Sequence, residues 1–242
     1  MITALRRLAR RLLPEGQRLF MARMRRGLRD RFSGDARRMA RRGDPGATPL
    51  FRIVEIAQPI RQTAFAEGKL ANIRLGAARL DGVTIAPGEI FSFWTLIGAP
   101  SAAEGFELGR SIRGGAIAGE VGGGLCQVSG IAYELLLRGG LDPIERHPHS
   151  RDLYSEEERF TPLGLDATVV WPYRDLRLAN RLGVPVTMRI GVDGMTLRAS
   201  LHAPEPRGAL SVAIERVDHH DHRAVSVSRA GVPVSVDHYA LT

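Results

Sequence analysis

The 242-residue sequence contains a single cysteine, Cys126. One thiol cannot form a disulfide within the chain, so the fold lacks the disulfide framework of small secreted proteins. The sequence also has no run of 18 apolar residues, which excludes a membrane-spanning helix. Arginines interrupt every apolar stretch near its start, which argues against a signal peptide. These absences predict a cytoplasmic protein or one at the inner face of a membrane.

Several motifs of well-known enzymes are missing as well. The sequence has no P-loop, no serine-hydrolase elbow and no dinucleotide-binding glycine pattern. The glycines between Gly109 and Gly115 lack the spacing and the strand-to-helix context that a nucleotide site requires. No cofactor is therefore predicted.

Positive charge is concentrated at one end of the chain. Residues 1–42 hold 14 basic and three acidic residues, whereas the other 200 residues hold 20 basic and 23 acidic ones. Within this arm Phe20, Met24, Leu28 and Phe32 recur every four residues, which predicts an amphipathic helix. Such a helix can lie on an anionic membrane or pack on the globular part. Nucleic acid is disfavoured, because the arm has almost no Lys, Asn or Gln for base contacts.

Composition and turn residues divide the chain into three parts. Gly43–Gly46 is a linker, so we expect a basic arm over residues 1–43, a domain over 44–205 and a β-rich extension over 206–242. The globular part is expected to fold without residues 1–42. A shorter arm segment before Pro14 carries Leu5, Leu8 and Leu12.

Helices are predicted early and strands late, which favours an α+β fold: a few helices packed on a largely antiparallel sheet, with a β-rich C-terminal half. Apolar periodicity indicates helices at 67–80 and 125–138, and turns at 87–89, 114–115, 122–124, 139–140, 193–194 and 229–231 separate the elements. The predicted strands are 51–56, 83–85, 90–93, 143–149, 166–171, 176–179, 184–190, 195–202, 210–214, 224–227 and 232–236.

The densest chemical signal is the run from Gly122 to Ser129, which reads GGGLCQVS. Its three glycines let the backbone approach a ligand closely, and Cys126 falls in the first turn of the second helix. There the unsatisfied N–H groups and the helix dipole stabilise a thiolate, which is the nucleophilic form of cysteine.

A histidine partner is available downstream, at His147 or His149. A helix of about 13 residues covers roughly 19 Å, and a returning strand of about six residues recovers about 20 Å. An antiparallel return therefore brings one of these histidines level with Cys126 at a glycine-lined cleft. We favour His149, with His147 as the second choice, and either Asp152 or Asp166 as the group that orients the imidazole.

Two further roles are weighed for the same residues. Gln127 adjoins the cysteine and is a candidate oxyanion donor, with its backbone N–H the better one. Cys126, His147 and His149 could also hold zinc, and so could the histidines of the segment 219–222. His-Pro-His is an unusual ligand spacing and the second group lies in a polar turn, so no metal is predicted.

Five ordered motifs resemble the VanW-like family over about residues 67–204. They are Asn72–Leu75 with Leu80–Gly82, Ile85–Phe93, Gly122–Ser129, Ile144–His147 with His149–Ser150, and Asp166–Val169 with Asp175–Leu176. In this sequence Gly130-Ile131-Ala132-Tyr133 stands where many members carry threonines, and Phe93-Trp94 replaces a common Phe-Asn.

The resemblance implies a link to the cell envelope, because the family is named for an accessory protein encoded with vancomycin-resistance genes. Two hypotheses follow. The first is a cysteine-dependent hydrolase or acyl transferase acting on a peptidoglycan-related peptide or precursor, with Gly122, Gly123, Gly124, Ser129 and Glu145 around the substrate. The second is a non-catalytic binding or scaffold domain that holds a wall precursor at the membrane, anchored by residues 1–42.

Overall fold

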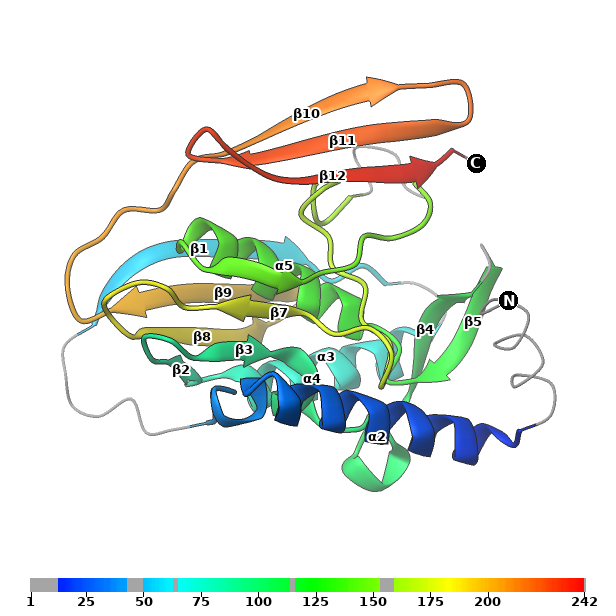
Figure 1. Cartoon of the computed structure of the whole chain (residues 1–242). Helices are drawn as coiled ribbons and strands as arrows, with labels where there is room; N and C mark the ends of the chain where they lie inside the picture. The colour runs from blue at the N-terminus through cyan, green and yellow to red at the C-terminus, as the bar shows by residue number, and fades with distance from the viewer. Residues whose placement is uncertain (1–12, 43–49, 63–64, 114–115, 153–158, 242) are drawn as a thin grey trace. The chain divides into compact units, whose positions relative to one another are not determined.

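The computed structural model describes residues 13–42, 50–62, 65–113, 116–152 and 159–241. The chain divides into two compact units, Met1–Met39 and Ala40–Thr242, which are described separately. The helices, labelled as in Figure 1, are α2 (Glu15–Phe32), α3 (Ala66–Leu80), α4 (Phe93–Ile97) and α5 (Leu125–Arg138), with short 3-10 turns η1 (Asp35–Arg37) and η2 (Ala102–Glu104). The strands are β1 (Phe51–Pro59), β2 (Thr84–Ile85), β3 (Ile90–Ser92), β4 (Leu108–Arg113), β5 (Ala116–Val121), β6 (Asp142–Glu145), β7 (Arg177–Ala179), β8 (Val186–Asp193), β9 (Thr196–Ala203), β10 (Val212–Asp218), β11 (His222–Arg229) and β12 (Val232–Ala240).

The first unit is formed mainly by α2, which begins directly after Pro14. Proline fits this place because it fixes φ and has no N–H to leave unpaired. The apolar stripe of Phe20, Met24, Leu28 and Phe32 is exposed along this helix. The segment that carries Leu5, Leu8 and Leu12 and the linker at 43–46 lie outside the described residues.

The second unit is built on a four-stranded antiparallel sheet with the order β1-β9-β8-β2. Helix α3 packs against β8, α5 packs against β9 and β1, and the two helices contact each other. Nearly every side chain of α5 is buried. A helix that is apolar on all sides is stable only inside a core, so the residues at its ends are held firmly.

Two smaller sheets complete this unit. The sheet β3-β7-β6 is antiparallel, and its last strand leads into the segment that carries the histidines. The C-terminal sheet β10-β11-β12 is antiparallel too, and its inner side chains Val225, Val227 and Tyr239 belong to the hydrophobic core of the unit. The C-terminal sheet, shown in Figure 1, thus shares the core of the second unit through these three side chains.

The fold class is α+β, as the sequence predicts, with a β-rich C-terminal half. The helices predicted at 67–80 and 125–138 are confirmed as α3 and α5, and the turn predicted at 193–194 joins β8 to β9 in a hairpin. No helix in the described part of the chain is long and apolar enough to cross a bilayer.

Some predicted strands are wrong in extent or in kind. The strand predicted over 143–149 ends at Glu145. The strand predicted over 90–93 ends at Ser92, because α4 begins at Phe93. Residues 166–171, which were predicted as a strand, form a loop with one isolated bridge. In that loop, backbone carbonyls accept hydrogen bonds from side chains and not from a neighbouring strand. Arg146 donates to the carbonyl of Asp166, and Ser129 donates to the carbonyl of Ala167. The hairpin of β4 and β5 was not predicted, because its glycines are typical of turns; its own turn at 114–115 lies outside the described residues.

The second unit begins a few residues before the linker. Ala40 is fully buried, its N–H donates to the carbonyl of Ile90 at 2.8 Å, and Arg42 forms a bridge with Val83. We expect a chain that starts at Ala40 to fold cooperatively. A chain that starts at Thr48 should be less stable by about 1–3 kcal/mol, since it loses these bonds and the burial of Ala40. Urea denaturation followed by circular dichroism measures both; equal stabilities, or an unfolded product from Ala40, would contradict this boundary.

Candidate functional site

Cys126 is the second residue of α5, after an N-cap at Gly124. The first N–H groups of a helix have no partner within it and attract negative charge. Here the N–H groups of Leu125 and Gln127 donate to the carbonyls of Gly122 and Gly124. The N–H groups of Cys126 and Val128 have no backbone acceptor among the described residues. The thiol itself is half-buried.

The glycines before Cys126 serve packing within the protein. A Cβ on Gly123 would stand 2.2 Å from the carbonyl oxygen of Gly109, and one on Gly124 would stand 2.8 Å from Cγ of Lys69. Gly124 also has a φ of 105°, a region that other residues rarely adopt. The amide of Asn72 donates to the carbonyl of Gly123 at 2.9 Å and fixes this turn on α3. These contacts give Gly123 and Gly124 a structural reason to be glycine, and the glycine-lined cleft stays a prediction.

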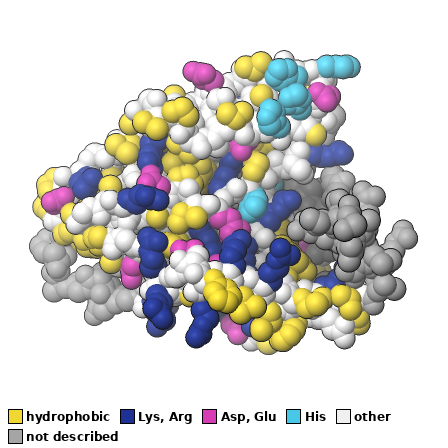
Figure 2. Space-filling model, in the orientation of Figure 1, with side chains coloured by type: hydrophobic (Ala, Val, Ile, Leu, Met, Phe, Trp, Pro, Cys, Tyr) yellow, Lys and Arg dark blue, Asp and Glu magenta, His cyan; other side chains and the backbone are white. Residues whose placement is uncertain are grey.

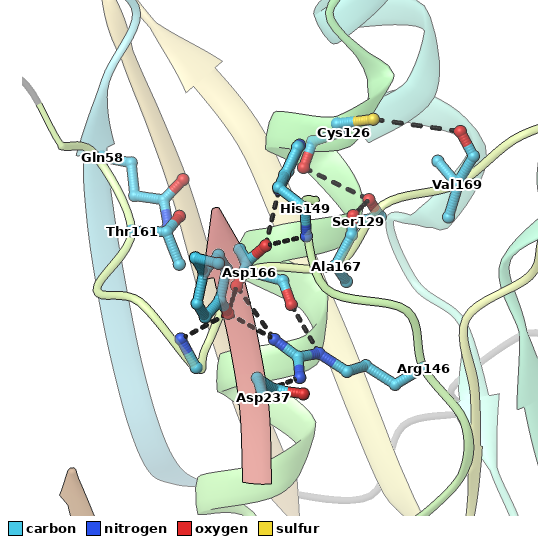
Figure 3. A network of polar contacts seen from close by, with 12 residues as sticks. Gln58, Cys126, Ser129, Arg146, His149, Thr161, Asp166, Ala167, Val169 and Asp237 are labelled. Atoms are coloured by element: carbon cyan, nitrogen blue, oxygen red, sulfur yellow. Dashed lines mark hydrogen bonds and ion pairs between the residues drawn. The ribbon is translucent and has the colours of Figure 1, made fainter. Parts of the chain in front are cut away.

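His149 is bound to Asp166 through two hydrogen bonds. Its ring Nδ1 lies 2.6 Å from Oδ2 of Asp166, and its backbone N–H donates to the same oxygen at 2.7 Å (Figure 3). A ring nitrogen that faces a carboxylate carries a proton, which leaves Nε2 as the other, reactive position of the ring. His149 keeps 40% of its side-chain surface exposed, whereas the side chain of Asp166 keeps only 11%.

The thiol of Cys126 also interacts with this histidine. Burial alone would lower the pKa of His149, but hydrogen bonds with Asp166 and with Cys126, and the charges of both groups, raise it to about 10. The sulfur lies 3.9 Å from the carbonyl oxygen of Val169, in the loop after Asp166. The structure therefore binds His149 to Asp166 and brings Cys126 close enough to His149 to raise the pKa of the imidazole, while the sulfur itself is directed to the carbonyl of Val169 (Figure 3).

Asp166 is held in its charged form by its surroundings. Burial alone would raise its pKa, but His149, Arg146 and Tyr239 hold the pKa well below the ordinary value of 3.8. Nη2 of Arg146 lies 2.9 Å from Oδ1, and the hydroxyl of Tyr239 donates to the same oxygen at 2.6 Å. The choice between Asp152 and Asp166 is thus settled, since Asp152 binds Arg159 and Arg223.

Other predicted site residues have their polar groups engaged within the protein. Nε2 of His147 lies 3.2 Å from Oε1 of Glu145, so His147 is paired away from the thiol. The side-chain amide of Gln127 donates to the carbonyl of Pro59 at 2.9 Å, and its backbone N–H donates to the carbonyl of Gly124. Ser129 donates to the carbonyl of Ala167 at 2.6 Å and ties the loop after Asp166 to α5.

Glu145 has a structural role too. Its Oε1 accepts the N–H of Asp175 at 2.9 Å, and its Oε2 lies 3.7 Å from Nε of Arg177. These contacts hold the end of β6 against the start of β7. Glu145 therefore positions the segment that leads to His149. Its own histidine partner, His147, lies two residues before His149 in the chain.

Metal binding was the other chemistry considered for these side chains. No group of three or more His, Cys, Asp or Glu in the described residues has an arrangement that could hold a metal ion. His219 and His222 stack at 4.5 Å between ring centroids, and His238 lies 5.1 Å from His222. They form a surface patch of histidines on the C-terminal sheet (Figure 2).

Sequence reasoning missed three residues of the site: Arg146, Tyr239 and Lys69. Arg146 sits inside a quoted motif, and Tyr239 lies far along the chain with no motif around it. Lys69 is the one lysine among 34 basic residues, which is a signal that could have been noticed. It is buried beside Gly124, and burial, helped by the charges of Arg110 and Arg61, lowers its pKa to about 8.

Replacing Asp166 with asparagine should return His149 to an ordinary titration. The carboxylate is the largest of the influences that raise the pKa of His149, so Asp166→Asn should move the pKa from about 10 towards 6.5. The fully charged imidazolium should then be present only below about pH 6 instead of across the neutral range. NMR titration of labelled protein, with His149 assigned from a His149→Gln variant, measures this. An unchanged titration would show that Asp166 does not govern the imidazole.

Comparison with known proteins identifies relatives of this chain. The chain is 31% identical over 134 residues to YoaR of Bacillus subtilis (strain 168), an uncharacterized protein, which is 55% of this chain and 43% of that one. It is 32% identical over 116 residues to the vancomycin B-type resistance protein VanW of Enterococcus faecalis (strain ATCC 700802 / V583), which is 48% of this chain and 42% of that one. The chain thus matches less than half the length of each of these relatives. No solved structure matches it significantly.

The family described as VanW like protein matches residues 68–202, which include Cys126, His149 and Asp166. Because this match covers more than half of the sequence, the chain belongs to the VanW-like family.

Proposed function

We propose that this protein is a cysteine-dependent hydrolase or acyl transferase, with Cys126 as nucleophile, His149 as general base and Asp166 as the group that orients His149. The observation that carries the proposal is the hydrogen bond between the ring of His149 and the buried carboxylate of Asp166, together with a Cys126 thiol that is close enough to the same imidazole to raise its pKa. A cysteine that only fills space needs no such partners, and free cysteines in proteins are usually inert.

The geometry supports a two-step acyl transfer. His149 takes the thiol proton on Nε2, and the Cys126 thiolate attacks the carbonyl carbon of the substrate to form a tetrahedral intermediate. The free N–H of Cys126 can donate to the oxyanion at this stage. The intermediate expels its leaving group, to which His149 returns the proton, and a thioester remains on Cys126. Water or an amine, deprotonated by His149, then releases the acyl group and restores the thiol.

The substrate class is argued from the family. The relative from Enterococcus faecalis is by name a vancomycin B-type resistance protein, and vancomycin acts on the cell wall. We therefore propose a peptidoglycan-related peptide or its precursor as the acyl donor. An amide or ester of such a peptide is a suitable electrophile for a thiolate.

A non-catalytic binding domain is the alternative. It would hold a wall precursor without bond breakage, and it would need neither a reactive thiol nor a paired imidazole. The orientation of His149 by Asp166 has no evident use in that case. The two functions differ most clearly in the reactivity of Cys126.

We expect Cys126 to react with iodoacetamide at pH 6, where an unassisted thiol of pKa about 8.5 is almost fully protonated. His149→Gln and Asp166→Asn should each slow this reaction at least about tenfold, because they remove the imidazolium that stabilises the thiolate. The rate is read by mass spectrometry, and the single cysteine of the chain makes the adduct unambiguous.

Matched controls are available for both variants. His147→Gln and Asp152→Asn change the neighbouring histidine and a second buried aspartate, whose partners are Glu145 and Arg159. Both should leave the rate within about twofold of the unmodified protein. A thiol that does not react at pH 6, or four variants that behave alike, would favour the binding domain.

We also propose that the arm anchors the protein on an anionic membrane, which would place it at the inner face. The exposed stripe of α2 supplies apolar contact, and Arg23, Arg25, Arg26 and Arg29 lie on the same helix. Amphipathic basic helices bind lipid through these two terms together.

Vesicle co-sedimentation tests this anchor. The full chain should bind vesicles with phosphatidylserine and lose binding when Met24 and Leu28 are replaced by serine, which keeps the charge and removes apolar area. It should bind neutral vesicles at least about tenfold more weakly, because each basic residue near an anionic surface contributes about 1 kcal/mol. Equal binding to both vesicles, or binding that persists in a chain starting at Ala40, would contradict the proposal.

A further inference from the structure

Strand β12 contacts Asp166 directly and contacts the backbone that follows His149. On the histidine side, Ala240 of β12 lies beside the residues that follow His149. Its N–H donates to the carbonyl of Ser150 at 3.1 Å, and its carbonyl accepts the N–H of Asp152 at 3.0 Å. A parallel bridge joins Arg151 to Ala240. The backbone after His149 is therefore fixed to β12.

On the carboxylate side, the contact is the side chain of Tyr239, one residue earlier. Tyr239 is fully buried, and its hydroxyl donates to Oδ1 of Asp166 at 2.6 Å. The same hydroxyl accepts the N–H of Gly164 at 2.9 Å, so the phenol also holds the backbone that leads to Asp166. Both hydrogen-bonding functions of the hydroxyl are used.

A third contact joins β12 to Asp166 through Arg146, which lies after β6 and pairs with Asp237 of β12. Its Nη2 lies 2.9 Å from Oδ1 of Asp166 and its Nε donates to the carbonyl of Asp166 at 2.7 Å. Its Nη1 pairs with Asp237 of β12 (Figure 3). Thus Oδ1 of Asp166 is held by Tyr239 and Arg146, and Oδ2 is left to His149.

We propose that β12 is a positioning element of the catalytic site, in which Tyr239 holds the Asp166 carboxylate and Ala240 holds the chain beside His149. This inference rests on the proposed function. It extends the site beyond residues 68–202, the part that matches the family. The residues on β12 act through Asp166 and His149, so they position the catalytic groups and do not touch the substrate.

The physical reason is the freedom of a carboxylate to rotate about its χ2 bond. With two donors on Oδ1, rotation would break two hydrogen bonds and leave buried donors unpaired, which is costly. With one donor removed, Oδ2 can turn away from the ring of His149 for part of the time. The charged and titratable groups that face Asp166 are His149, Arg146 and Tyr239, and those that face His149 are Asp166 and Cys126.

The test compares Tyr239→Phe with Tyr133→Phe. Tyr133 is a matched control, because it is also fully buried and its hydroxyl has no hydrogen-bond partner among the described residues. NMR titration of His149 in the full chain is the main measurement. Tyr239→Phe should lower the midpoint by about one pH unit or more, towards that of Asp166→Asn. Tyr133→Phe should leave it where it is.

A second variant covers the case in which Tyr239→Phe does not fold. The N–H of Ala240 bonds to Ser150 and not to β11, so proline at this position removes that bond without removing one from the sheet. Ala240→Pro should also lower the midpoint of His149, because the segment after the histidine is released.

The outcomes separate this inference from the proposed function. If His149 titrates as in the unmodified protein in both Tyr239→Phe and Ala240→Pro, β12 does not position the pair. If Tyr133→Phe moves the midpoint as far as Tyr239→Phe, the effect is a general loosening of the core and the inference fails. If the midpoint moves only in the β12 variants while alkylation of Cys126 is independent of His149, the positioning stands and the catalytic proposal falls.

Discussion

The carboxylate of Asp166 is a charge enclosed by protein, and such a charge is stable only when donors surround it. Four groups do so here: the backbone and ring of His149, the guanidinium of Arg146 and the hydroxyl of Tyr239. They come from one loop and one strand that are far apart in sequence, and Asp166 itself lies in a second loop. Removing one partner of a buried ion pair typically costs about 3–5 kcal/mol, so these segments hold one another in place around the carboxylate. The orientation of His149 toward Cys126 depends on this arrangement.

The pairing of Cys126 with His149 could be predicted because it needs only lengths. A helix that begins at the cysteine and a chain that turns back at two glycines must return to the same level. The strand assumed for the return is shorter than predicted, and it ends at Glu145. The remaining residues cross back as a loop whose hydrogen bonds are made by side chains, with Arg146 and His149 both bound to Asp166. His149 still comes near Cys126, because a loop and a strand of equal length can span similar distances.

Other features depend on contacts that spacing does not contain. Asp152 and Asp166 are both aspartates shortly after the histidines, and only the folded structure shows that the first binds arginines. The glycines at 122–124 suggested an opening for a ligand, whereas Gly109 and Lys69 occupy the space that side chains there would take. A glycine in a sequence indicates that some group approaches the backbone closely. It does not indicate whether that group belongs to a ligand or to the protein itself. Tyr239 lies at the end of an ordinary alternating strand, so its pattern indicates burial and nothing more.

The residues of the candidate site lie partly inside and partly outside the segment that matches the family. The residues proposed to carry the chemistry, Cys126, His149 and Asp166, all lie within residues 68–202, the part of the chain that matches the family. The groups that fix the acid are divided between that part, through Arg146, and the C-terminal sheet, through Asp237 and Tyr239. A buried charge needs its full set of partners in every protein that contains it. A relative that has counterparts of Cys126, His149 and Asp166 but lacks this sheet must therefore supply hydrogen-bond donors to its aspartate from another element. That element should lie on the side of the aspartate where Tyr239 and Asp237 lie here, next to the counterpart of Arg146.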